Sequence, residues 1–250
     1  MLKTSLVDQI YQIIKQKILS LELSWNQRID TQQLAEGFGI SQTPIRDALN
    51  RLAADGLVKV QPRVGYYVMQ ADHRDVVEIY DLRIIFESHV LPAAIQNLNR
   101  AKIEKLKEKM ERLQHEEMNE DKKRKEFQKL DEQLHGLIIE SSNNKRLKNF
   151  FSQIYDFVLI FQHMDTTIND PLEEHIVFLD ALLRQDLSRA RSTLCTHIHN
   201  ARDRLLRKLK ETYQETAKGL STDWDTSAFH NLGKKNGMRN AYGKRGQGNL

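Results

Sequence analysis

The chain has 250 residues and a formal net charge of +4 at pH 7, which is length enough for two domains and too mild a charge to indicate nucleic-acid binding by itself. It contains no run of 18 apolar residues and no signal-peptide pattern in residues 1–20, which argues against membrane-spanning and secreted classes. The single cysteine, Cys195, excludes an internal disulfide, so we expect a soluble cytoplasmic protein with no membrane partner.

The first elements of the chain are predicted to be helical. Apolar residues recur at helical spacing in residues 1–20, and residues 34–57 predict two more helices joined by a tight turn. We expect the first of these two helices to end at Leu34 and Ala35. Gly37 and Gly39 then allow the turn, because glycine adopts positive φ values without steric cost.

The second helix of this pair begins with capping residues and carries one apolar stripe. Ser41 or Thr43 is expected to cap it, and Pro44 lies in its first turn, where a missing N–H costs no hydrogen bond. The spacing i, i+3, i+4 and i+7 predicts a buried stripe of Ile45, Ala48, Leu49 and Leu52.

The opposite face of the second helix is polar. Gln42, Arg46 and Asn50 follow one another at intervals of four residues, so their side chains share a face. Such side chains reach base edges and phosphates from a helix that lies in the major groove. The alternative is an ordinary helix pair in which Arg46 is only solvated.

A β-hairpin is predicted directly after this helix. The β-prone runs 57–60 and 66–69 flank a turn that contains Pro62 and Gly65. Arg63 is expected at the tip of the turn, in reach of a phosphate or the minor groove. The turn, the caps, the stripe and the hairpin together favour DNA binding by a winged helix-turn-helix.

The remainder of the chain is predicted to be a helical bundle followed by a tail. Helical periodicity places helices at about 75–98, 102–118, 122–141, 145–164, 171–185 and 187–215, with a kink at Pro92. We therefore expect a mainly α protein. Its parts are a winged helix-turn-helix domain at 1–70, a linker at 71–77, an all-α ligand- and metal-binding domain at 78–218 and a disordered basic tail at 219–250.

Four residues in the predicted bundle form a candidate metal site. Asp131 and His135 are four residues apart beside apolar neighbours, so both face inward from one helix. His175 and His197 lie among apolar residues on two later helices. A lone buried histidine is more often a hydrogen-bonded core residue, but four potential ligands on three helices are typical of a metal site.

Residues 8–70 resemble the GntR family of bacterial regulators. The resemblance rests on Leu34-Ala35, Ser41 to Leu49, Leu52, Gly56-Leu57 and the hairpin Arg63 to Val68. It implies operator contacts from Ser41, Gln42, Thr43, Arg46 and Arg63, and Asn50 and Gly65 complete the candidate DNA-binding residues.

Two positions depart from the usual pattern of this family. Gln42 and Val64 stand where the family often has arginine. Glutamine pairs with adenine and arginine with guanine, so we expect an altered operator sequence at the position that Gln42 contacts. A phosphate contact would be lost at Val64 or shifted to Arg63.

Residues 75–217 resemble the FCD domain, the ligand-binding domain of FadR-type regulators. The resemblance is carried by Tyr80 to Arg83 with Glu87, Asp131 with His135, Ser142 to Asn144, Glu174-His175, Ala181, Asp186 and His197. It implies that Asp131, His135, His175 and His197 bind a divalent ion, which could be Zn, Ni, Mn or Fe. It also implies that Arg83 faces an effector pocket, whereas the alternative for Arg83 is a surface or intramolecular pair with Glu87.

The resemblance as a whole implies a bacterial transcriptional regulator, more commonly a repressor, that associates with the nucleoid. It would bind a short inverted repeat of double-stranded DNA as a homodimer and respond to a small organic acid held at the metal. In one alternative the metal is structural or is itself the signal. In another the protein is a helical metallohydrolase with Glu173 or Glu174 as general base.

Overall fold

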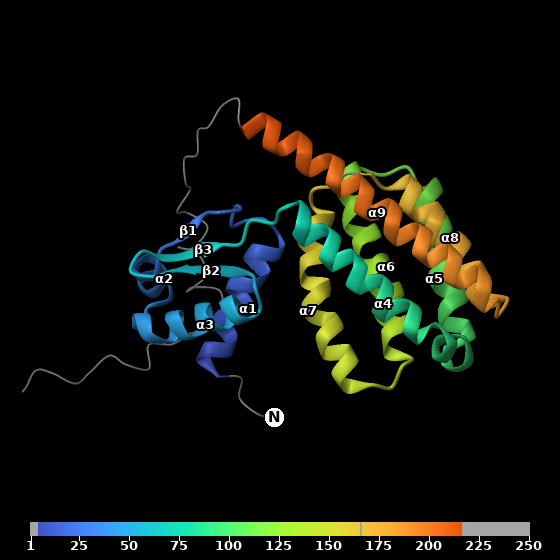
Figure 1. Cartoon of the computed structure of the whole chain (residues 1–250), viewed down its shortest axis with the longest axis horizontal. Helices are drawn as coiled ribbons and strands as arrows, with labels where there is room; N and C mark the ends of the chain where they lie inside the picture. The colour runs from blue at the N-terminus through green and yellow to red at the C-terminus, as the bar shows by residue number, and fades with distance from the viewer. Residues whose placement is uncertain (1–4, 166, 217–250) are drawn as a thin grey trace, which may run out of the picture. The chain divides into compact units, whose positions relative to one another are not determined.

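The computed structural model describes residues 5–165 and 167–216, and these fall into two compact units (Figure 1). One unit holds most of the chain as far as Gln70, and the other begins at Ala71. None of the helices in the described ranges is long and apolar enough to cross a membrane. The predicted tail at 219–250 lies outside the described residues.

The first unit is a helix-turn-helix with a small sheet. Its elements are α1 (Leu6–Leu19), β1 (Arg28–Ile29), α2 (Thr31–Phe38), α3 (Gln42–Ala54), β2 (Val58–Gln61) and β3 (Gly65–Val68). The predicted stripe of α3 is fully buried, together with Ile10 and Ile14 of α1. The winged helix-turn-helix is thereby confirmed, and its core is the apolar face that the spacing predicts.

The end of the first motif helix differs from the prediction. We expected it at Leu34 and Ala35, but α2 continues to Phe38, whose side chain is buried. The helix ends at Gly39, which adopts a left-handed φ of 67° and donates its N–H to carbonyls of the last turn. Gly37 therefore lies inside the helix, and only Gly39 uses the freedom of glycine.

The cap of α3 is only partly as predicted. Ser41 occupies the N-cap position in extended conformation, but its side chain makes no capping hydrogen bond. Thr43 lies inside the first turn of the helix. The polar start of α3 is consequently left open to solvent.

The sheet has three antiparallel strands in the order β1-β3-β2. β2 and β3 form the predicted hairpin, with Gln61 opposite Gly65 at its closed end. β1 adds a third strand by pairing Arg28 with Tyr67. The sequence did not indicate β1, because two residues are too few to show an alternating pattern.

The second unit is a bundle of helices. Its elements are α4 (His73–Asn97), α5 (Arg100–His115), α6 (Glu120–Glu140), α7 (Lys145–Gln162), α8 (Asn169–Leu183) and α9 (Leu187–Thr216). α9 packs on α4 and α8, α5 packs on α8, and α6 contacts α4, α5 and α7. The predicted helices are confirmed, and the largest difference in their ends is three residues, at the end of α5 (118 predicted, 115 observed).

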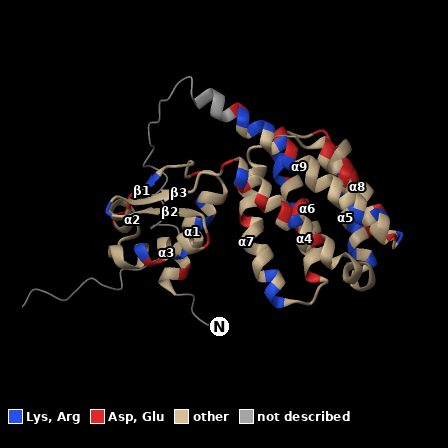
Figure 2. Cartoon of the chain, viewed as in Figure 1, with Lys and Arg blue, Asp and Glu red and all other residues tan. Residues whose placement is uncertain are grey.

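The surfaces of the bundle helices carry charges of both signs. α5 buries Ile103, Leu106, Met110 and Leu113 and leaves its many charged residues toward solvent. Figure 2 shows Lys, Arg, Asp and Glu intermixed along α5 and α9. These charges are solvated faces of a bundle whose core is apolar.

α4 begins abruptly. The carboxylate of Asp72 accepts hydrogen bonds from the backbone N–H groups of Arg74 and Asp75, and the Asp75 carboxylate accepts one from the N–H of Asp72. This capping box fixes the helix start at His73. Of the linker expected at 71–77, only Ala71 and Asp72 precede the helix.

Candidate functional site

The candidate DNA-binding residues of α3 share one outward face. Ser41, Thr43 and Arg46 are exposed, and Nη2 of Arg46 donates to Oε1 of Gln42 at 3.1 Å. The hydroxyl of Tyr66 donates to Oδ1 of Asn50 at 2.8 Å. Asn50 is thus linked to β3, and its amide N–H groups remain for a base or a phosphate.

The hairpin brings three arginines together with α3. Arg63 lies exposed at the turn, with a φ of 63°, and Gly65 follows with a φ of 141°. Nη2 of Arg28 donates to the carbonyl of Val64 at 3.3 Å. Arg28, Arg46 and Arg63 line one hollow of about 440 Å³. The sequence gave no sign of Arg28, because only the pairing of β1 with β3 brings it to the hairpin.

The four candidate metal ligands converge inside the bundle. Asp131 and His135 come from α6, His175 from α8 and His197 from α9, and all four are buried. One ligand atom of each residue lies within 4.8 Å of those of the others. Oδ1 of Asp131 is 3.3 Å from Nε2 of His175 and 3.5 Å from Nε2 of His135.

Two glutamates orient two of the histidines. Oε2 of Glu87, on α4, accepts a short hydrogen bond from Nδ1 of His135. Oε2 of Glu174, on α8, accepts one from Nδ1 of His197 at 2.8 Å. Both imidazoles are therefore held with Nε2 free for another partner, as in carboxylate–histidine–metal arrangements. The sequence could not indicate these pairs, because each joins segments far apart in the chain.

The carboxylate of Asp131 is held from its other side. Its Oδ2 accepts hydrogen bonds from the Tyr155 hydroxyl and from Nε2 of Gln162, both at 2.5 Å. Burial raises the pKa of Asp131, but nearby His135 and its hydrogen bond outweigh burial and leave the pKa well below the usual value. Asp131 is consequently ionised, with Oδ1 directed at the histidines.

The histidines are in the form that binds metals. Burial, followed by repulsion from a neighbouring histidine, holds the pKa of His175 and of His197 well below the usual histidine value. Nε2 of His175 and Nε2 of His197 lie 3.1 Å apart. Ligands that are about 2.0–2.2 Å from one ion lie roughly 3 Å from one another, so the donor types and their spacing fit a divalent cation.

Arg83 lies beside this cluster. Its Nε donates to Oε1 of Glu87 at 2.9 Å, and its Nη2 lies 3.1 Å from Nε2 of His135. Burial lowers the pKa of Arg83, but Glu87 outweighs burial and raises it, so the guanidinium stays charged. The expected pair with Glu87 exists, and it is buried rather than at the surface.

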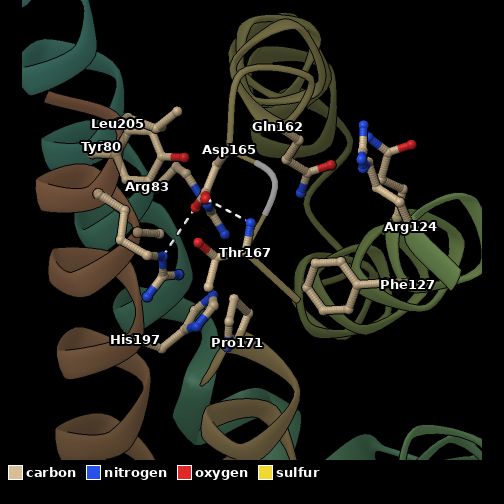
Figure 3. Close-up of a pocket in the computed structure, with 13 residues that line it drawn as sticks. Tyr80, Arg83, Arg124, Phe127, Gln162, Asp165, Thr167, Pro171, His197 and Leu205 are labelled. Carbon is tan, nitrogen blue, oxygen red and sulfur yellow. Dashed lines mark hydrogen bonds and ion pairs between the residues drawn. The ribbon is translucent and has the colours of Figure 1, made fainter. Parts of the chain in front are cut away.

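A small cavity adjoins the cluster (Figure 3). It has a volume of about 30 Å³. Arg83, His197, Tyr80 and Arg204 line it from α4 and α9, Arg124, Phe127 and Gln128 from α6, and Gln162, Asp165, Thr167 and Pro171 from the end of α7 to the start of α8. Arg83 therefore faces both the candidate metal ligands and the cavity.

The residues proposed as a hydrolytic base are placed unfavourably for that role. Glu174 accepts hydrogen bonds from His197, from Nδ2 of Asn200 at 2.7 Å and from Arg204 at 3.5 Å. Glu173 is exposed. A general base needs a free carboxylate directed at the reacting water, and neither glutamate offers one.

Comparison with known proteins gives the same division of the chain. Residues 6–68 match the family described as "Bacterial regulatory proteins, gntR family", and residues 78–200 match the FCD domain. The HTH-type transcriptional regulator YdhC of Bacillus subtilis is 26% identical over 207 residues, which cover 81% of this chain and 92% of that protein.

Two further similarities complete the comparison. A probable D-xylose utilization operon transcriptional repressor of Paenarthrobacter nicotinovorans is 26% identical, over 78% of this chain and 87% of that protein. The structure of McbR/YncC of E. coli superposes with a TM-score of 0.66 at 23% identity, over 84% of this chain and 99% of that one. The chain belongs to the GntR family of transcriptional regulators, with a gntR-type DNA-binding domain followed by an FCD domain.

Proposed function

We propose that this DNA-binding regulator is a repressor whose operator affinity is controlled by a small carboxylate bound beside a divalent ion in the FCD domain. The observation that carries the proposal is the convergence of four buried ligands next to a buried arginine and a cavity. Relatives of known role include the D-xylose operon repressor and a gluconate operon transcriptional repressor.

The metal would be held by Asp131, His135, His175 and His197. Three neutral imidazoles and one carboxylate suit Zn, Ni, Mn or Fe. When bound, the ion would supply positive charge and open coordination positions for a carboxylate oxygen. A transcriptional regulator needs only this binding chemistry, and the hydrogen bonds of Glu174 leave no base for hydrolysis.

Arg83 would hold the carboxylate from the protein side. Its Nη2 now donates to Nε2 of His135, which is one of the nitrogens that a metal would take. Loading of the site would release this N–H for another acceptor, and a carboxylate oxygen is the strongest common acceptor for a guanidinium. Arg83 thereby links the state of the cluster to α4.

The DNA-bound form is proposed to be a homodimer on an inverted repeat. A two-fold protein presents the same reading surface to each half of a palindromic site. In the bundle, Ile85 of α4 and Phe150 of α7 are 60% and 58% exposed and line one hollow. We assign this α4–α7 face to contact with a second copy.

The proposal is tested by thermal shift with the zinc-loaded full chain and a series of small mono-, di- and hydroxy-carboxylates, repeated after chelation. An acid that binds only the folded form at a hundredfold excess over its Kd adds about 2.7 kcal/mol of stability. We expect the shift for an active acid to vanish on chelation and the same acid to weaken operator binding in a gel-shift titration.

Two variants sharpen this test. His197→Ala removes a ligand and is expected to abolish both the zinc-dependent and the acid-dependent shift. His199→Ala removes an exposed imidazole two residues along the same helix and should change neither. If chelation lowers the melting temperature while no acid shifts it, the carboxylate proposal is wrong and a structural metal is indicated.

A further inference from the structure

The cavity next to the cluster is lined by three arginines, and their charges are balanced unequally. Arg83 is paired with Glu87, and Arg204 donates to Oδ2 of Asp165 at 2.9 Å and lies 3.5 Å from Glu174. The ion pair of Arg124 is longer: its Nη2 is 3.8 Å from the carboxylate of Asp121, which is 78% exposed. Arg124 is therefore the lining cation whose charge is balanced least.

Three buried polar atoms on the lining residues have no hydrogen-bond partner among the residues that the structure describes. They are Nε of Arg124, Nε2 of Gln128 and Oε1 of Gln162. The first two are donors and the third is an acceptor. Leaving such groups unpaired in the interior costs free energy, so this part of the cavity is complementary to a ligand with acceptor oxygens and one donor.

The orientation of the Gln162 amide follows from its contact with Asp131. Its Nε2 donates to the ionised carboxylate at 2.5 Å, which leaves Oε1 as the free end. An unpaired amide oxygen is satisfied by a hydroxyl and not by a carboxylate. One side chain thus connects the candidate metal ligands to a potential hydroxyl position.

These groups are arranged along a single helix face. Arg124, Gln128, Asp131 and His135 stand at i, i+4, i+7 and i+11 on α6. The rise of 1.5 Å per residue puts Arg124 roughly 10 Å along the helix axis from Asp131, before either side chain reaches inward. In Figure 3, Arg124 and Arg83 lie on opposite sides of the cavity, with Gln162 between them.

From this arrangement we infer that the effector is a hydroxylated dicarboxylic acid. The inference rests on the proposed function, which places one carboxylate at the metal and Arg83. The second carboxylate binds Nε of Arg124 and Nε2 of Gln128, and a hydroxyl between the two donates to Oε1 of Gln162. Arg124 thus determines specificity for a second anionic group, and Gln162 determines specificity for the hydroxyl.

Entry of such an acid requires movement at the Arg124 end. A cavity of about 30 Å³ holds one or two water molecules. The side chain of Arg83 is 2% exposed, whereas that of Arg124 is 28% exposed and is able to swing outward. The solvent-facing arginine is therefore placed to close over an acid that has entered.

Three probes of matched skeleton test this inference on the zinc-loaded full chain by calorimetric titration. Malate carries both carboxylates and the hydroxyl, 3-hydroxybutyrate replaces one carboxylate by a methyl group, and succinate lacks the hydroxyl. We expect malate to bind at least tenfold more tightly than either of the others. Arg124→Gln should remove the advantage of malate over 3-hydroxybutyrate while leaving the affinity for 3-hydroxybutyrate unchanged.

Lys125→Gln is the matched control, because it removes the same charge from the adjacent, exposed position of α6. It should preserve the full malate advantage. Equal affinities for malate and 3-hydroxybutyrate, unchanged by Arg124→Gln, would overturn the inference while the metal-bound carboxylate stands. If none of the three acids binds the zinc-loaded chain, the inference and the proposed function both fail.

Discussion

Arg46 is the side chain of α3 best placed to read a base. It is exposed, and its one guanidinium contact with Gln42 is given up easily in exchange for a guanine edge. Arg46→Ala is expected to abolish specific operator binding, with a loss of about 1–3 kcal/mol for a bidentate base contact and no change in melting temperature. Arg112→Ala, on the exposed side of α5, is the control, and unchanged operator affinity of the Arg46 variant would rule out a reading role.

Gln42 sets a second base preference. Its Oε1 accepts from Arg46, so its amide N–H₂ faces outward as a donor in the pair that these two side chains form. Gln42→Arg should change the preferred base at one position of each half-site from adenine toward guanine. Binding-site selection with the wild type and the variant checks this, and identical sequence logos would show that Gln42 reads no base.

Glu174 acts on the metal through His197. Its carboxylate fixes the imidazole by a 2.8 Å hydrogen bond to Nδ1. Glu174→Gln should weaken zinc binding about 10–100-fold in a competition titration with a chelator, because such outer partners orient the ligand and raise its basicity. Glu173→Gln changes the exposed neighbouring carboxylate and should leave zinc affinity intact; equal effects of the two variants would assign Glu174 a merely electrostatic role.

At the scale of single elements, α6 carries both a metal ligand pair and an avoidable weakness. Gly136 lies inside this helix, and a Cβ added there meets nothing within 4 Å. Gly136→Ala should raise the free energy of unfolding by about 0.5–1 kcal/mol, because alanine loses less backbone entropy in a helix. Urea unfolding measures this, zinc affinity should be unchanged, and a destabilised variant would mean that the helix is distorted at Gly136.

The elements themselves were largely predictable, and the limits of prediction are physical. Long amphipathic helices announce themselves by their period, and Asn99, Asn119 and Asn144 mark helix starts by capping backbone N–H groups. α2 was predicted too short, because Gly37 is a poor helix residue that tertiary burial of Phe38 overrides. Local sequence statistics do not contain such tertiary effects.

The site shows the same division. Asp131 and His135 were predictable as a pair because helical spacing alone puts them on one face. Glu87, Arg124 and Gln162 meet that pair only through packing of α4, the cavity-lining face of α6 and α7. Contacts of this kind depend on how whole helices are laid together, which no local pattern encodes.

For the whole molecule, the proposed second copy makes a direct prediction. In a two-fold interface each residue occurs twice, so one substitution introduces two charges. Ile85→Asp should convert the dimer to monomers in light scattering and reduce operator affinity accordingly. Val64→Asp, at another apolar position that is 50% exposed, should leave the oligomeric state unchanged; a persistent dimer in the Ile85 variant would move the interface elsewhere.

The capping box of Asp72 has a consequence for signal transmission. The DNA-binding unit extends to Gln70, and α4 is rigid from His73 onward, so no more than two residues separate them. Two residues span at most about 7 Å and have little slack to absorb a displacement. Arg83 and Glu87 stand three to four turns into that same helix. A rotation or slide of α4 caused at these two side chains is thus delivered to the DNA-binding unit almost undamped, as through a shaft without a flexible joint.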